Sequence, residues 1–90
     1  MKIIYRLVTY SRETERIIGS HDIPEPVVAK AKEIAGISWD DDGCGDYPLD
    51  SGQTRKIGRL LDVPVTPDTA DYFVEPYVYE RDAEDRAAGT

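Results

Sequence analysis

The sequence predicts an α+β domain in which a three-stranded antiparallel sheet has two helices on one face, in the order β-β-α-α-β. Three observations support this fold class. Lys2–Tyr10 is rich in β-branched and aromatic residues, as is the later stretch Ala70–Glu80. Between them, residues 22–36 and 50–61 place apolar side chains at helical spacing. A sheet of this size needs helices over one face to bury enough apolar surface for a domain of 90 residues.

The first two strands are predicted to form a hairpin over residues 2–21. Lys2–Tyr10 has apolar side chains on both faces, which indicates an interior strand. The polar stretch Ser11–Thr14 is typical of a turn, and Glu15–Ser20 returns as the second strand, with Gly19 ending or bulging it.

The first helix is predicted to begin after Asp22, whose side chain can accept hydrogen bonds from free backbone N–H groups in the first turn. Pro24 and Pro26 are tolerated in that turn, and Gly36 is a good C-terminal stop. The apolar residues at helical spacing are Val27, Val28, Ala31, Ile34 and Ala35.

The second helix is predicted to start at Asp50, because Asp50 and Gln53 have the spacing of a capping box. The stretch before it, Ile37–Tyr47, is predicted to be a loop. Ile57, Leu60 and Leu61 are expected to face the core.

The closing strand, Ala70–Glu80, contains Pro76, which cannot donate a hydrogen bond to a neighbouring strand. This strand is therefore predicted to lie at an edge of the sheet or to be broken at Pro76. Residues 80–90 are charged and have no apolar face, so we predict one domain over residues 1–79 and a flexible tail over 80–90.

Composition limits the function classes. The formal net charge of −7 disfavours nucleic acid as a ligand, because phosphate binding needs a basic surface, and it suits a basic protein partner. No apolar run approaches the roughly 20 residues that span a bilayer. The single cysteine excludes an internal disulfide. We therefore expect a cytoplasmic protein with no membrane contact, either a monomer or a weak homodimer.

The stretch Asp40–Asp46 gathers carboxylates beside glycines, and oxygen-rich turns of this kind can bind Ca²⁺. A calcium-loop frame started at Asp40 or Ser38 lacks the acidic residue that the template needs at its twelfth position. Two other interpretations stay open: a solvated acidic turn, or a contact for a basic partner that relieves repulsion among adjacent carboxylates.

Several residues near this stretch are candidate binding residues. Trp39 is either a core anchor or an interface anchor ringed by charge. Arg55 and Arg59 share a basic helix face, which is either solvated or able to bind a carboxylate or phosphate. The complete predicted set is Trp39, Asp40, Asp41, Asp42, Asp46, Tyr47, Arg55 and Arg59.

No catalytic residues are predicted. Cys44 would need a base, and His21 is the only histidine, but nothing in the sequence places the two together. No phosphate loop, cofactor motif or structural metal motif is present either, so the expected protein is not an enzyme and has no cofactor.

Four short segments together resemble a group of small uncharacterised bacterial domains. They are Tyr10–Glu15 after the opening strand, Tyr47-Pro48-Leu49 four residues before Gln53, Leu60-Leu61, and the closing segment Asp71–Tyr77. Proteins similar to that group are often suspected of being immunity or antitoxin-like binders. The resemblance implies the α+β fold and no established activity.

The sequence thus leaves the function unknown and favours a small acidic binding module, immunity- or inhibitor-like, with a basic protein as partner. The alternative is a metal- or ligand-responsive domain that uses the Asp40–Asp46 loop.

Overall fold

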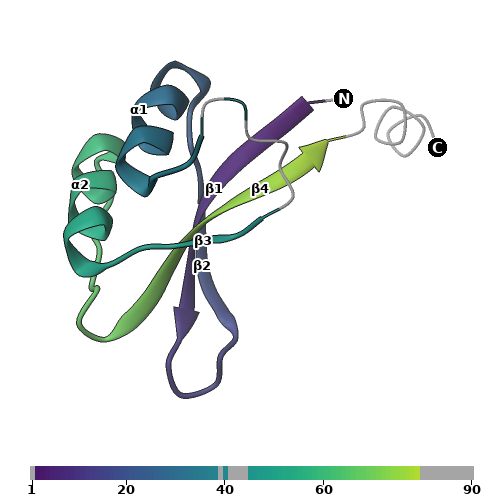
Figure 1. Ribbon diagram of the computed structural model, residues 1–90. Coiled ribbons are helices and arrows are strands. Elements are labelled where there is room, and N and C mark those ends of the chain that lie inside the picture. Colours follow the sequence, from purple (N-terminus) through teal and green to yellow (C-terminus); the bar gives the residue numbers. More distant parts are fainter. Residues whose placement is uncertain (1, 39, 41–44, 80–90) are drawn as a thin grey trace.

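A computed structural model describes residues 2–38, 40 and 45–79, and within them an antiparallel sheet has two helices on one side (Figure 1). The α+β class and the two helices on one face agree with the prediction. The elements in chain order are β1 (Lys2–Ser11), β2 (Ile17–Asp22), α1 (Glu25–Ala35), β3 (Tyr47–Pro48), α2 (Ser51–Leu61) and β4 (Ala70–Tyr79). The predicted tail, residues 80–90, lies outside the described residues.

The sheet has four strands in the order β2-β1-β4-β3, so the prediction of three strands is wrong. The additional strand is β3, which pairs Tyr47 with Val74 and Pro48 with Phe73. Two residues, one of them proline, have no sequence periodicity of their own, and pairing with β4 alone defines them as a strand. The β1–β2 hairpin forms as predicted, with a register shift between Thr9 and Tyr10.

Strand β4 is not broken at Pro76, because it pairs with β1 over its whole length, with Pro76 opposite Tyr5. The Tyr5 carbonyl accepts from the Ile23 N–H at 2.8 Å, so the polar backbone groups of Tyr5 point away from β4. Tyr5 and Pro76 therefore form a non-hydrogen-bonded antiparallel pair, in which the backbone polar groups of Pro76 point away from β1. Pro76 therefore removes a donor only from the edge of β4 that β3 leaves uncovered.

The two helices begin differently. Asp50 and Gln53 form the predicted capping box at the start of α2, with the Gln53 N–H donating to Asp50 Oδ1 at 2.7 Å. The predicted cap of α1 is wrong: the N-cap position is Pro24, without a side-chain bond. Asp22 is instead the last residue of β2 and pairs with Arg6 across the sheet.

The core lies between the sheet and the helices. Leu7 and Val74 from the sheet, with Ala31 of α1 and Ile57 of α2, belong to this cluster. Gly58 lets the chain after α2 approach closely, since a Cβ there would lie 3.0 Å from the Val63 carbonyl oxygen. No helix in the described part of the chain is long and apolar enough to cross a membrane.

Candidate functional site

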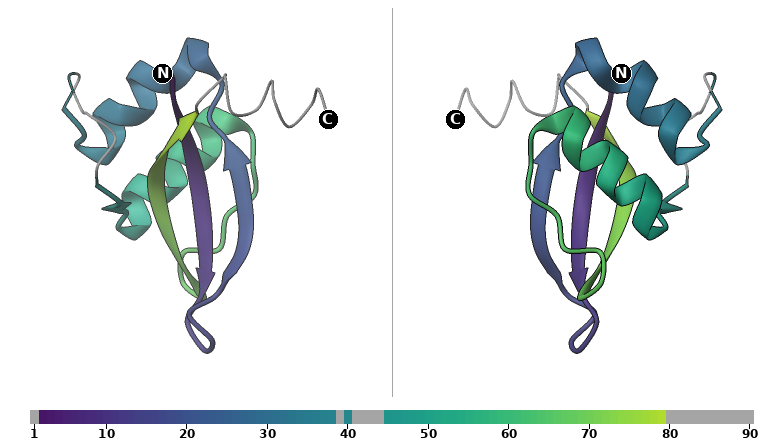
Figure 2. Two further views of the ribbon diagram at one scale, coloured as in Figure 1. Left: turned by 90° about the vertical axis from the view of Figure 1, so that its right-hand side faces the viewer. Right: turned by 90° about the vertical axis from the view of Figure 1, so that its left-hand side faces the viewer.

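The side of the sheet opposite the helices is uncovered in the described structure (Figure 2). Because side chains alternate along a strand, the residues of β1 and β4 that do not face the helices project from this side. We call it the open face, and its central residues are Arg6, Val8, Tyr10, Phe73, Glu75 and Tyr77.

Aromatic side chains form a second layer on the open face. Val8 is 0% exposed even though it faces away from the helices. Its cross-strand neighbour Phe73 and the nearby Tyr10 place their ring centroids 5.3 Å apart in an edge-to-face arrangement. These rings are half-buried, and they lie on the same face of the sheet as Val8, where no described helix lies.

Glu75 is the buried acid of this layer. It is only 6% exposed, and its two carboxylate oxygens accept hydrogen bonds from two tyrosines. The Tyr10 hydroxyl donates to Oε2, and the Tyr77 hydroxyl donates to Oε1 at 3.0 Å. No ion pair joins Glu75 to a lysine or arginine within the described residues. The side-chain hydrogen bonds to this buried carboxylate therefore come from neutral hydroxyl groups.

This arrangement changes the acidity of both tyrosines. The hydrogen bond that Tyr10 donates to Glu75, together with burial and the charge of Glu75, raises the pKa of Tyr10 to about 12. The pKa of Tyr77 is raised by burial first and then by its own hydrogen bond to Glu75, while the charge of Arg6 opposes the rise. Tyrosine hydroxyls are protonated at neutral pH even at their ordinary pKa of about 10, and the raised pKa keeps both groups donors to still higher pH.

At one end of the open face, Arg6 makes two contacts of its own. Its Nε donates to Asp22 Oδ1 at 2.7 Å, and its Cζ lies 4.6 Å from the Tyr77 ring centroid. The carboxylate and the aromatic face thus bind one guanidinium group from within the chain.

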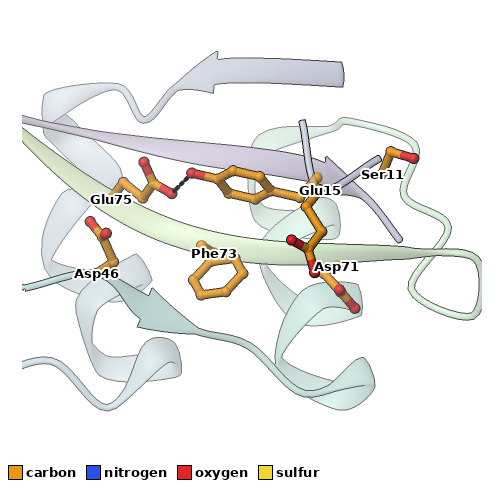
Figure 3. Close-up of a pocket in the computed structure, with 7 residues that line it drawn as sticks. Ser11, Glu15, Asp46, Asp71, Phe73 and Glu75 are labelled. Carbon is orange, nitrogen blue, oxygen red and sulfur yellow. Dashed lines mark hydrogen bonds between the residues drawn. The ribbon is translucent and has the colours of Figure 1, made fainter. Parts of the chain in front are cut away.

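At the other end lies a cavity of about 320 Å³, which we call the acidic cavity. Its lining residues are Tyr10, Ser11, Glu15, Asp46, Asp71, Phe73 and Glu75. Figure 3 shows Glu75 and Asp46 toward one end, Glu15 and Asp71 toward the other, and Phe73 between them. Among the residues that the structure describes, four carboxylates and two rings line it, and no lysine or arginine does.

Three different segments bring the outer carboxylates to this cavity. Glu15 comes from the β1–β2 turn, in the left-handed backbone region with φ of 59°. Asp46 stands immediately before β3. Asp71, on β4, accepts a hydrogen bond from Arg12 Nε at 3.0 Å, and the same guanidinium donates to the Asp68 and Pro67 carbonyls at 2.7 and 2.8 Å.

The described lining of this cavity suits a positively charged group. Carboxylates supply hydrogen-bond acceptors and negative potential, and aromatic rings attract cations through their faces. The carboxylates are spread around the cavity: within residues 2–38, 40 and 45–79, no three acidic, histidine or cysteine side chains are grouped to hold a metal ion.

Of the predicted acidic binding residues, Asp46 is the one that lines the cavity. Tyr47 is half-buried in β3 and packs against the core. Asp40 is exposed and accepts a hydrogen bond from the Ser38 hydroxyl. Trp39, Asp41 and Asp42 lie outside the described residues, so the predicted loop stays untested as a contact or metal site.

The predicted basic residues lie elsewhere. Arg55 and Arg59 are exposed on α2, on the helix side of the sheet, and Arg55 Nη2 lies 3.5 Å from Asp68 Oδ1. His21 is exposed near the end of β2, and Cys44 is outside the described residues. Among the described members of the predicted set, Arg55 and Arg59 therefore lie on the opposite side of the sheet from the cavity that Asp46 lines.

Sequence reasoning missed most of the cavity, namely Tyr10, Glu15, Asp71, Phe73 and Glu75. A signal was present in the closing strand, where Phe73, Glu75 and Tyr77 alternate onto one face. An acid between two aromatic residues on one face of a strand is unusual enough to mark that face as more than packing.

These features define a small α+β domain with an uncovered sheet face and a cavity lined by acids and aromatic rings. The chain belongs to the family described as a domain of unknown function (DUF7683), which matches residues 4–75. No curated protein and no solved structure matches the chain. The function of the family is unknown, so the chemistry of the site is the evidence that bears on it.

Proposed function

We propose that this protein is a non-enzymatic protein-binding module whose open face receives basic side chains of a partner protein. The observation that carries the proposal is Glu75, a carboxylate that is 6% exposed and has two tyrosine hydroxyls but no ion pair with any described residue. Burying a carboxylate without an ion pair is unfavourable, and two neutral hydrogen bonds offset only part of that penalty. A cation arriving from a partner would supply the missing charge.

The remaining charges favour the same kind of partner. The net charge of −7 attracts a basic protein over long range and speeds association. Asp46, Glu15 and Asp71 are exposed around the cavity, so they retain water until a partner displaces it. The half-buried Tyr10 and Phe73 rings supply apolar contact area at the centre of the same surface.

More specifically, we propose an immunity- or inhibitor-like role in a bacterial cytoplasm, in which the partner is a basic toxin or another basic protein. It rests on three features: small size, acidic charge and an uncovered sheet face ready for contact. When the partner binds to the open face, the module would in turn cover a functional surface of the partner and block it. Predicted as a monomer or weak homodimer, the protein would leave the face free to do so.

The test is capture of partners from the lysate of the source cell by three immobilised forms of the full chain. The first is the wild type, and the second is the open-face variant Glu15→Gln/Asp46→Asn. The third is the control variant Glu33→Gln/Asp62→Asn, which removes the same charge from exposed residues of the helix side. Bound proteins are eluted with about 0.5 M salt, which screens exposed charges, and identified by mass spectrometry.

We expect the wild type and the control variant to retain the same basic protein, and the open-face variant to lose most of it. Equal recovery by all three forms would show that the open face is not the contact. Loss with the control variant alone would move the binding surface to the helices and overturn the proposal.

A further inference from the structure

One end of the open face already binds a guanidinium group that belongs to the chain itself. Arg6 lies with its Cζ 4.6 Å from the Tyr77 ring centroid while its Nε donates to Asp22 at 2.7 Å. A guanidinium is planar, weakly hydrated and forked, so it can contact a ring and hydrogen-bond a carboxylate at once. The open face is therefore compatible with this group at its surface.

The acidic cavity, at the other end, has the same kinds of side chain, and its described lining residues include no lysine or arginine. Phe73 and Tyr10 supply rings, and four carboxylates surround them. Asp71 is paired with Arg12. Glu15 and Asp46 form no ion pair with any residue that the structure describes. Two outer carboxylates are thus available to a ligand.

Glu75, at the base of this layer, still has acceptor capacity. An ionised carboxylate offers about four lone-pair positions, and the two tyrosine hydroxyls occupy one on each oxygen. A donor entering the cavity can use the others without displacing either tyrosine. A forked donor is the best match, because it can reach Glu75 and an outer carboxylate together.

From these observations we infer that the acidic cavity is a receptor for an arginine side chain of the partner and selects arginine over lysine. The inference rests on the proposed function, because it names the group that the open face receives. The guanidinium lies against the Phe73 ring, its N–H groups reach Glu75 and Asp46, and Glu15 closes the opposite end.

Lysine fits this cavity less well. Its ammonium group is compact and strongly hydrated, with donors that do not lie in one plane. It gains the same long-range attraction but loses the contact with the ring and the paired hydrogen bonds to spread carboxylates. The preference for arginine over lysine therefore depends on the Phe73 ring, whereas the attraction of either cation depends on Glu15 and Asp46.

The experiment titrates N-acetyl-arginine amide and N-acetyl-lysine amide separately into the isotopically labelled full chain at low salt. Backbone and side-chain NMR signals of Tyr10, Phe73 and Glu75 are followed. We expect saturable shifts with arginine amide in the millimolar range and about threefold or more weaker binding of lysine amide. Phe73→Leu should bring the two affinities together, and Glu15→Gln/Asp46→Asn should weaken both ligands. The control variant Glu33→Gln/Asp62→Asn should change neither.

The outcomes separate this inference from the proposed function. Equal affinity for the two amides, lost in the open-face variant, would overturn selection for arginine and leave a general basic contact intact. Shifts that occur only on the helices, or none at the cavity with either amide, would overturn the arginine site. The wild-type comparison alone decides this point even if Phe73→Leu unfolds.

Discussion

On the helix side of the sheet, Leu7 belongs to a core cluster that includes residues of both helices, whereas the adjacent Val8 lies on the open face, where no described helix lies. Both residues are 0% exposed. The helix side excludes water with aliphatic groups from α1 and α2. The open face does so with aromatic rings and a carboxylate held by tyrosine hydroxyls. Equal burial can therefore come from different packing: one side joins aliphatic groups of the sheet and the helices, and the other combines aromatic rings with a hydrogen-bonded carboxylate.

The largest effect is expected from truncating the two neighbours separately. Leu7→Ala should lower the free energy of unfolding by about 3 kcal/mol, because the rigid core cannot collapse around the lost volume. Val8→Ala should lower it by about 2 kcal/mol, since one carbon atom fewer is removed and the rings above can settle. Urea unfolding of both variants measures the difference. If Val8→Ala were the more destabilising change, the open face would be a second core and the contrast between the two sides of the sheet would fail.

The sequence was informative wherever a feature is local. Asp50 and Gln53 predicted their capping box because the two residues are three positions apart, and the β1–β2 hairpin followed from a stretch of β-branched and aromatic residues and a polar turn. Asp22 was assigned to the wrong role because its partner Arg6 is brought opposite it by strand pairing. Strand β3 was missed for the same reason: Tyr47 and Pro48 become a strand only beside Val74 and Phe73.

The candidate site was predicted still less completely. Asp46 was included as one member of an acidic run, but its cavity neighbours come from β4 and from the end of the first hairpin. Their meeting depends on the register that sets Val8 opposite Phe73 and Arg6 opposite Glu75. Sequence alternation shows which residues share a face of one strand. It does not show how two distant strands are aligned.

An intermediate effect is expected from removing the hydroxyls that hold Glu75. Tyr10→Phe leaves one oxygen of a buried carboxylate without its donor, which should lower the free energy of unfolding by about 2 kcal/mol at neutral pH. Tyr77→Phe is the matched change on the other oxygen and should cost less, because the hydrogen bond to Glu75 is the first cause of the raised Tyr10 pKa but not of the raised Tyr77 pKa. Urea unfolding of the two variants at pH 7 measures both losses, and a larger loss for Tyr77→Phe would contradict this order.

The stability that the Tyr10 hydroxyl contributes to the wild type should also depend on pH. The folded pKa of Tyr10 is about 12, above the value of roughly 10 for an unfolded chain. The protonated hydroxyl is therefore favoured by folding, and its contribution is fully present below about pH 10 and lost as pH rises toward 12. Wild-type stability should fall through this window, and the difference between wild type and Tyr10→Phe should shrink. Denaturant unfolding near pH 8, 10 and 11 measures it; a constant difference would mean that the hydroxyl does not bond to Glu75.

The smallest expected effect separates stability from binding at Glu15. This residue holds a positive φ of 59°, which is unfavourable for a long side chain and well tolerated by asparagine. Glu15→Asn removes that strain and one like charge from the rim of the acidic cavity. It should raise the free energy of unfolding by about 0.5 kcal/mol while weakening binding of arginine amide. Urea unfolding and the NMR titration on the same sample provide both numbers. Opposite signs would show that Glu15 serves the open face at the expense of the fold, because a residue that only supported the turn would gain stability without affecting the ligand. Stability and affinity that changed in the same direction would contradict this division of roles.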